Sequence, residues 1–297
     1  MIALPAVIVV ALVVLLTGGS DGEVPEGGPS PNVPASAAER ADRFDSARAW
    51  KHLKYQVALG PRPAGSPQLA KLAAYLRARL PRGHYEAVPG HPGLRNVVGR
   101  IPGRKPAVVV AAHYDTKDLP GFVGANDGAS GTAAVLELSR ALRKVKRPRG
   151  APEIRFVLFD GEEATDDSRP FEATGLRGSK AYAERHGDDV RALVLLDFVA
   201  EKGEMRIPRE AGSDERLWKR LRAAARRAGS GKAFPPGLVG EVTDDHTPFM
   251  RRGIPAIDLI DFTFDCWHET CDDLSAVSER SLDLSGEAVL ELLRTWR

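Results

Sequence analysis

Mostly apolar runs alternate with amphipathic stretches along most of this chain. The runs at 107–112, 154–159 and 192–198 predict strands covered on both faces, and shorter runs at 96–101 and 257–260 predict two more. Apolar residues recur with helical spacing at 37–58, 68–80, 130–145, 179–185, 214–228 and 281–296. This alternation predicts an α/β fold, in which a mixed, mostly parallel central sheet carries helices on both faces within a single domain.

The first 36 residues have a different pattern. Residues 2–16 form an uncharged apolar run broken by Pro5. The run is shorter than the roughly 17–25 residues that span a bilayer as a helix. We interpret 1–17 as a signal peptide or signal anchor, 18–36 as a disordered Gly/Pro/Ser linker and 37–297 as the folded domain. The domain is therefore expected outside the cytoplasm, either secreted or attached to a membrane through the N-terminal segment.

Composition narrows the class of protein further. The 42 Lys plus Arg residues nearly balance 40 Asp plus Glu, for a net charge of +2, so no nucleic-acid partner is expected. Hydrophobic residues make up 43% of the chain, which excludes a disordered or collagenous protein. Cys266 and Cys271 are too few for a disulfide scaffold. They are either bridged locally or unpaired. Nothing in the sequence indicates an oligomeric state.

Potential metal ligands follow the predicted buried strands. His113, Glu162, Glu163, Asp197 and His268 lie at or beyond strand ends, and Asp127 lies in a Gly-flanked turn before a predicted helix. Ligands of such sheets bind beyond the carboxyl ends of the strands. Imidazoles and carboxylates without a cysteine cluster suit zinc in an open catalytic site. Singly, each residue has a structural explanation, such as helix capping, but their joint placement predicts a metal centre.

The adjacent Glu162 and Glu163 suggest a division of labour. Neighbouring side chains do not both point at one ion, so one can bind metal while the other faces a metal-activated water. Zinc lowers the pKa of such a water towards about 7, and a nearby carboxylate can accept its proton and pass it to a leaving group. Hydrolysis is the predicted reaction type.

Six motifs together carry a family resemblance. They are HYDT at 113–116, GANDGASG at 124–131, FDGEE at 159–163, LLDFVA at 195–200, DDHTPFMRRGIPA at 244–256 and WH at 267–268. In this order the chain resembles the di-zinc aminopeptidases, a family that includes secreted bacterial enzymes and has the glutaminyl cyclases as close relatives. The resemblance runs from about Gly60 to the C-terminus. It implies a zinc-exopeptidase-like fold, with 37–297 as one catalytic domain acting on peptides.

The resemblance also implies roles for individual residues, including Glu162 as general base and acid. Asp127 would bridge two Zn²⁺ ions, His113 and Asp197 would complete one site, and Glu163 and His268 would complete the other. Asp115 would orient the imidazole of His113. A cis peptide bond between Asp127 and Gly128 is a further expectation. The implied activity is hydrolysis of N-terminal residues from peptides.

Two departures from the peptidase pattern keep a cyclase alternative open. Trp267 stands where peptidases often have Tyr, and both Trp before the last His and the pair Asp244-Asp245 are cyclase-like. A cyclase would hold one zinc through Asp127, Glu163 and His268. Proton transfer would then involve Glu162, Asp197 and Asp245. Against it, the stretch ATDDSRPF after Glu163 lacks the Trp of the cyclase pocket, and Asp258 stands where cyclases tend to have His.

The peptidase interpretation is favoured over the cyclase because the full set of five di-zinc ligands is present. A third hypothesis comes from another class of protein, a binding ectodomain that kept the fold and lost catalysis. Such relatives typically lose ligands or the catalytic Glu, and this chain retains both.

Overall fold

The computed structural model describes residues 44–297. The predicted signal segment at 1–17 and linker at 18–36 lie outside these residues, as does the beginning of the helix predicted at 37–58. Among the helices of residues 44–297, none is long and apolar enough to cross a membrane.

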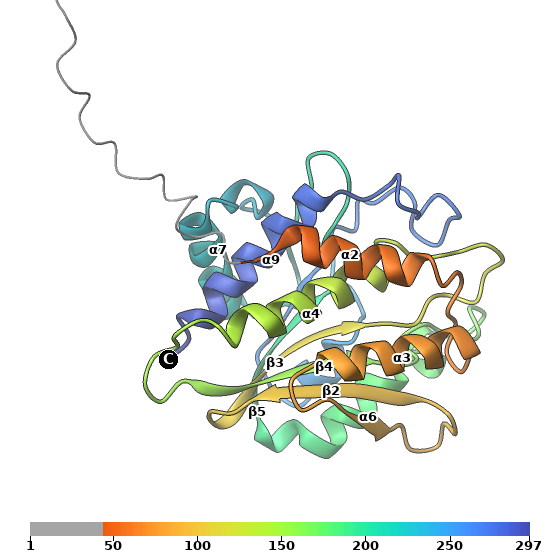
Figure 1. Ribbon diagram of the computed structural model, residues 1–297, viewed down its shortest axis with the longest axis horizontal. Helices are drawn as coiled ribbons and strands as arrows, with labels where there is room; N and C mark the ends of the chain where they lie inside the picture. The colour runs from red at the N-terminus through yellow and green to blue at the C-terminus, as the bar shows by residue number, and fades with distance from the viewer. Residues whose placement is uncertain (1–43) are drawn as a thin grey trace, which may run out of the picture. The chain divides into compact units, whose positions relative to one another are not determined.

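Within the described range, a six-stranded sheet of order β1-β2-β4-β3-β5-β8 forms the centre of the fold (Figure 1). Its strands are β1 (His84–Ala87), β2 (Arg95–Ile101), β3 (Arg104–His113), β4 (Pro152–Phe159), β5 (Val190–Leu196) and β8 (Ala256–Leu259). The pairs β4–β3, β3–β5 and β5–β8 are parallel, whereas β2 pairs antiparallel with both β1 and β4. The predicted mixed, mostly parallel sheet is confirmed.

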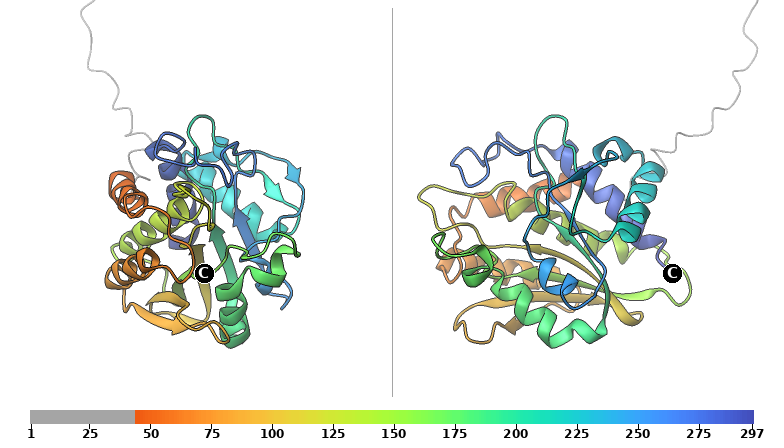
Figure 2. Two further views of the ribbon diagram at one scale, coloured as in Figure 1. Left: turned by 90° about the vertical axis from the view of Figure 1, so that its right-hand side faces the viewer. Right: turned by 180° about the vertical axis from the view of Figure 1, so that it is seen from behind.

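Helices cover both faces of this sheet (Figure 2). One face packs against α2 (Ser46–Val57), α3 (Pro67–Arg79), α4 (Ala129–Leu142), α7 (Glu215–Ala228) and α9 (Glu279–Arg294). The other packs against α6 (Arg177–His186) and α8 (Thr247–Met250). Successive residues of β3 therefore enter different cores: Val108 and Val110 join the first, and Val109 and Ala111 join the second. This is why most positions of the central strands are apolar.

Local sequence signals fix where the longer helices begin. Asp45, Ser66, Asp214 and Ser278 precede α2, α3, α7 and α9, and each side chain accepts a hydrogen bond from a backbone N–H of the first turn. Gly229, with a φ of 87°, ends α7 in the left-handed conformation that glycine adopts readily.

Several short elements are absent from the prediction. They are β1, the short helix α5 (Phe171–Thr174), the helix α8, and a second sheet formed by β6 (Arg209–Glu210) and β7 (Leu238–Val239), together with 3₁₀ turns at Gly187–Asp189 and Gly231–Ala233. The edge strand β1 has the sequence HYEA, which is short, polar and partly exposed. Such a segment shows no alternation of apolar and polar residues that would indicate a strand, so its pairing with β2 determines its structure.

Candidate active site

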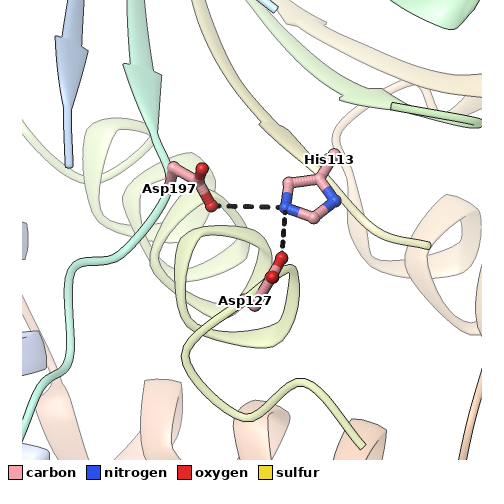
Figure 3. Close-up of side chains that lie close together, drawn as sticks. All are labelled: His113, Asp127 and Asp197. Carbon is pink, nitrogen blue, oxygen red and sulfur yellow. Dashed lines mark hydrogen bonds and ion pairs between the residues drawn. The ribbon is translucent and has the colours of Figure 1, made fainter. Parts of the chain in front are cut away.

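The predicted ligands meet at the carboxyl ends of the parallel strands. His113 is the last residue of β3, Asp197 follows β5 directly, and Asp127 lies in the loop that leads into α4 (Figure 3). Glu163 lies in the loop after β4, and His268 lies in the long loop between β8 and α9. The five side chains form two groups that share Asp127: His113, Asp127 and Asp197 in one, and Asp127, Glu163 and His268 in the other.

The two carboxylate oxygens of Asp127 face different histidines. Its Oδ1 lies 3.2 Å from Nε2 of His113, and its Oδ2 lies 3.6 Å from Nε2 of His268. Nε2 of His113 is also 3.2 Å from Oδ1 of Asp197, and Nε2 of His268 is 3.3 Å from Oε2 of Glu163. A carboxylate placed in this way between two donor groups has the geometry of a bridging ligand.

These separations fit a metal ion at each group. Ligand atoms at about 2.0–2.2 Å from one zinc ion lie roughly 3–4 Å from each other, as the atoms here do. Oε1 of Glu163 is buried and has no hydrogen-bond partner within residues 44–297. Nitrogen and carboxylate donors suit zinc, the ion implied by the sequence resemblance. The residues present therefore fit metal at both groups.

Asp115 connects His113 to the two glutamates. Its Oδ1 accepts the backbone N–H of Glu162 at 3.2 Å, and its Oδ2 accepts that of Glu163 at 3.3 Å. The same Oδ1 lies 3.7 Å from Nδ1 of His113, on the side of the ring opposite to Asp127. Asp115 is fully buried, so it can set the positions of both the imidazole and the glutamate loop.

A loop contact that the sequence did not reveal holds Asp127. Both oxygens of the buried Asp272 accept backbone N–H groups, from Asn126 at 2.7 Å and from Asp127 at 3.0 Å. Cys266 and Cys271 form a disulfide with an S–S distance of 2.02 Å. His268 lies between them and has a φ of 56°, which is unusual for a residue other than glycine. The bridged loop thus carries one candidate ligand, His268, and positions another, Asp127.

The peptide bond after Asp127 differs from the prediction. Among the described residues, the cis bond is Lys105–Pro106, so the expected cis bond between Asp127 and Gly128 is wrong. A cis bond at a non-proline residue costs about 3 kcal/mol. Here the turn is made by Gly128, whose φ is 86°. A Cβ at this position would lie 2.6 Å from the carbonyl oxygen of Asp115, so only glycine fits.

Burial and neighbouring charges shift the pKa of several groups at the site. Burial raises the pKa of Glu162 well above its usual value, opposed by His113 and reinforced by the charge of Glu163. Burial and the charge of Asp127 raise the pKa of Glu163 to about 7. Burial lowers the pKa of His113, but the surrounding carboxylates outweigh it and leave that pKa well above the usual value. A cation at the site would relieve this repulsion.

A cavity of about 480 Å³ opens onto the candidate ligands. Its walls include the predicted base Glu162 and the aromatic residues Phe171, Phe198, Phe262 and Trp267. Trp267 is 46% exposed and stacks on His268, with ring centroids 4.6 Å apart, while Phe262 lies 5.1 Å from Trp267. The cavity therefore combines buried acidic side chains with aromatic side chains that are partly exposed at its opening.

The two acidic residues before His246 lie in different environments. Asp244 lines the cavity, whereas its neighbour Asp245 is fully buried behind it. Burial and the charge of Asp244 raise the pKa of Asp245 well above its usual value. Sequence reasoning missed Asp244 because two adjacent acids give no sign of which one faces the site.

Comparison with known proteins identifies the family. Residues 96–293 match Peptidase family M28. The chain belongs to this family. A crystal structure of a leucine aminopeptidase precursor from Bacteroides thetaiotaomicron is similar with a TM-score of 0.77 and 26% identity, over 86% of this chain and 98% of that one. The Acidobacteriales bacterium glutaminyl cyclase has a TM-score of 0.73 and 30% identity, over 91% of this chain and 98% of that one.

Among curated M28-like sequences, the glutaminyl-peptide cyclotransferase of Bos taurus is 32% identical over 235 residues. The match covers 65% of this chain and 62% of the relative, so the chain spans less than two thirds of that protein's length. The family thus includes similar proteins named for hydrolysis and for cyclisation. The predicted membership of a zinc aminopeptidase family with cyclase relatives is confirmed.

Proposed function

We propose that this M28 protein is a zinc-dependent aminopeptidase that removes N-terminal residues from peptides. The observation that carries the proposal is the placement of Asp127, whose two oxygens face His113 and His268 at 3.2 Å and 3.6 Å. This arrangement supports two zinc ions held by His113, Asp127 and Asp197 and by Asp127, Glu163 and His268. Zinc would supply Lewis-acid activation of a water molecule and of the peptide carbonyl.

Glu162 is the residue best placed to move the proton. It lines the cavity, is 7% exposed, and its Oε2 lies 3.9 Å from Nδ1 of His113. Its raised pKa, caused first by burial, suits a group that accepts a proton and then returns it to the leaving amine. Asp115 holds the backbone of Glu162 in place, so the carboxylate is oriented before substrate binds.

Glutaminyl-peptide cyclisation is the second candidate function. Trp267 and Phe262 at the mouth of the cavity favour it, as does the similarity to proteins named as glutaminyl cyclases. In this reaction Glu162 would take a proton from the N-terminal amine and deliver it to the departing ammonia. Asp127, Glu163 and His268 would hold a single zinc.

Product analysis separates the two functions. The metal-loaded protein is incubated with a peptide that begins with glutamine and, in parallel, with one that begins with leucine. Free glutamine and free leucine support the aminopeptidase, whereas a pyroglutamyl peptide and ammonia from the first substrate alone support the cyclase. If neither product forms in the presence of zinc, both proposals are wrong, and a binding ectodomain remains.

We also propose an extracytoplasmic location. Disulfides persist in oxidising compartments, and the Cys266–Cys271 bridge fits such an environment. The apolar segment predicted at 1–17 supports the same location. Fractionation of cells that express the full chain tests it, because recovery in the cytoplasmic fraction alone would contradict the proposal.

A further inference from the structure

Behind the candidate active site lies a third group of potential metal ligands. Asp244, His246 and Asp258 each offer an atom within 4.8 Å of the others. Asp244 precedes α8, His246 is the N-cap of α8, and Asp258 lies within β8. Their exposed fractions are 3%, 0% and 0%. The proposed hydrolysis and cyclisation reactions assign no role to His246 or Asp258.

Most side-chain polar atoms of this group are buried without a hydrogen bond among the described residues. In the part of the chain that the structure describes, both ring nitrogens of His246, both oxygens of Asp258 and Oδ2 of Asp244 have no hydrogen bond. Folded proteins satisfy about 90% or more of such buried atoms, because each unsatisfied group costs free energy. Across residues 44–297, His246 and Asp258 have no hydrogen bond at any of their side-chain polar atoms, and Asp244 has one at Oδ1 only; so many unpaired atoms at one point indicate a missing ligand.

The charges of the group indicate a cation. Glu210 adds another buried carboxylate, with its Oε1 3.3 Å from Nε2 of His246, while Nδ1 of His246 lies 3.8 Å from Oδ2 of Asp258. Within residues 44–297, no lysine or arginine forms an ion pair with these three carboxylates. Glu210, Asp244 and Asp258 thus place three acidic side chains around one imidazole in a dry environment, where a bound cation would stabilise them.

We propose that Asp244, His246 and Asp258 bind a structural zinc ion, separate from the ions held around Asp127. One nitrogen and two carboxylate oxygens form a suitable donor set for zinc, and distances of about 2.0–2.2 Å to a central ion require only small side-chain movements from their present spacing. Asp244 also lines the large cavity, which gives the ion a route in. The ion links the N-terminus of α8 to β8 and neutralises charge behind Asp197.

Metal counting tests the site in the full chain. The protein is stripped with a chelator, equilibrated with Zn²⁺ in metal-free buffer, dialysed, and analysed for zinc by mass spectrometry. His246→Asn is expected to retain one zinc ion fewer per chain than the unmodified protein. Asp261→Asn is the matched control, because Asp261 is 1% exposed yet lies outside the group, and this variant should retain the full number. Equal counts in the His246→Asn variant and the unmodified protein would overturn the proposal.

Anomalous X-ray scattering at the zinc edge gives a second measurement that needs no variant. In crystals of the zinc-equilibrated protein, we expect a peak between His246 and Asp258, and its absence at full occupancy of the Asp127 sites refutes the third site. One or two peaks around Asp127 report on the cyclase or peptidase proposal separately. The two proposals can therefore fail independently.

Discussion

Glu162 is expected to be necessary for the reaction rate but not for zinc binding. We predict that Glu162→Gln lowers the turnover rate by at least about 100-fold, because an amide cannot accept the proton, while zinc content stays unchanged. Steady-state kinetics and metal analysis of the same preparation provide the measurement. Glu184→Gln, an exposed change on α6, is the control and should have normal activity. Loss of zinc from Glu162→Gln would show that this residue is a ligand.

Asp272 is expected to act through the backbone of the Asp127 loop. Asp272→Asn replaces one accepting oxygen with an NH₂ group, which cannot accept the N–H of Asn126 or Asp127. We predict a loss of about 10- to 100-fold in zinc affinity, measured by competition with a chromogenic chelator. Asp273→Asn, at a neighbouring partly exposed residue, should retain the affinity of the unmodified protein. Equal affinities in the two variants would contradict this role.

At the scale of single residues, sequence reasoning located the candidate ligands better than the residues that hold them in place. His113 and Asp197 could be located because each ends an apolar run, and strand ends meet at one edge of a parallel sheet. The role of Asp272 could not be inferred from the sequence. Its bonds to Asn126 and Asp127 join residues 146 and 145 positions apart, and no local pattern encodes such a contact.

The loop between β8 and α9 depends on its disulfide. We predict that the double change Cys266→Ser and Cys271→Ser weakens zinc binding at the group containing His268 by about 10-fold or more, because the unusual backbone of His268 is no longer constrained. Binding at the group containing Asp197 should change less. Stepwise zinc titration of the stripped protein measures both, and a uniform loss at the two groups would argue for general unfolding.

Helices and strands could be predicted where they are long enough to show a pattern of apolar and polar residues. The core strands β3, β4 and β5 each contain a mostly apolar run, and the prediction found all three. The strands β6 and β7 have two residues each, which is too short for any alternation, so tertiary contacts determine them. The bounds of α4 shifted from the predicted 130–145 to 129–142, because the basic residues that follow do not pack against the sheet.

Stability of the metal-free molecule should depend on pH. Burial, followed by nearby charge, raises the pKa of Glu163, Asp160 and Asp272 to about 7 each. Their unfolded values lie near about 4, so the folded chain binds more protons between these values and loses stability as pH rises from about 4 to about 7. In chelator, we predict a fall in melting temperature of at least about 5 °C from pH 5 to pH 8.

Zinc should reverse this trend, because metal replaces the protons and stabilises the charged carboxylates. With zinc present, the melting temperature at pH 8 is expected to exceed that of the chelated protein at the same pH, and differential scanning calorimetry measures both. A metal-free protein whose stability rises between pH 5 and pH 8 would contradict the assigned pKa shifts.

The link from the Cys266–Cys271 bridge through Asp272 to Asp127 has a consequence for when the enzyme matures. A newly synthesised chain in a reducing compartment lacks the bridge, so neither His268 nor the Asp127 loop is held in position. We expect such a chain to bind zinc more weakly than the bridged protein does. Oxidation after export would complete the metal centre. Under the proposed function, the protein would then not hydrolyse peptides inside the cell that makes it.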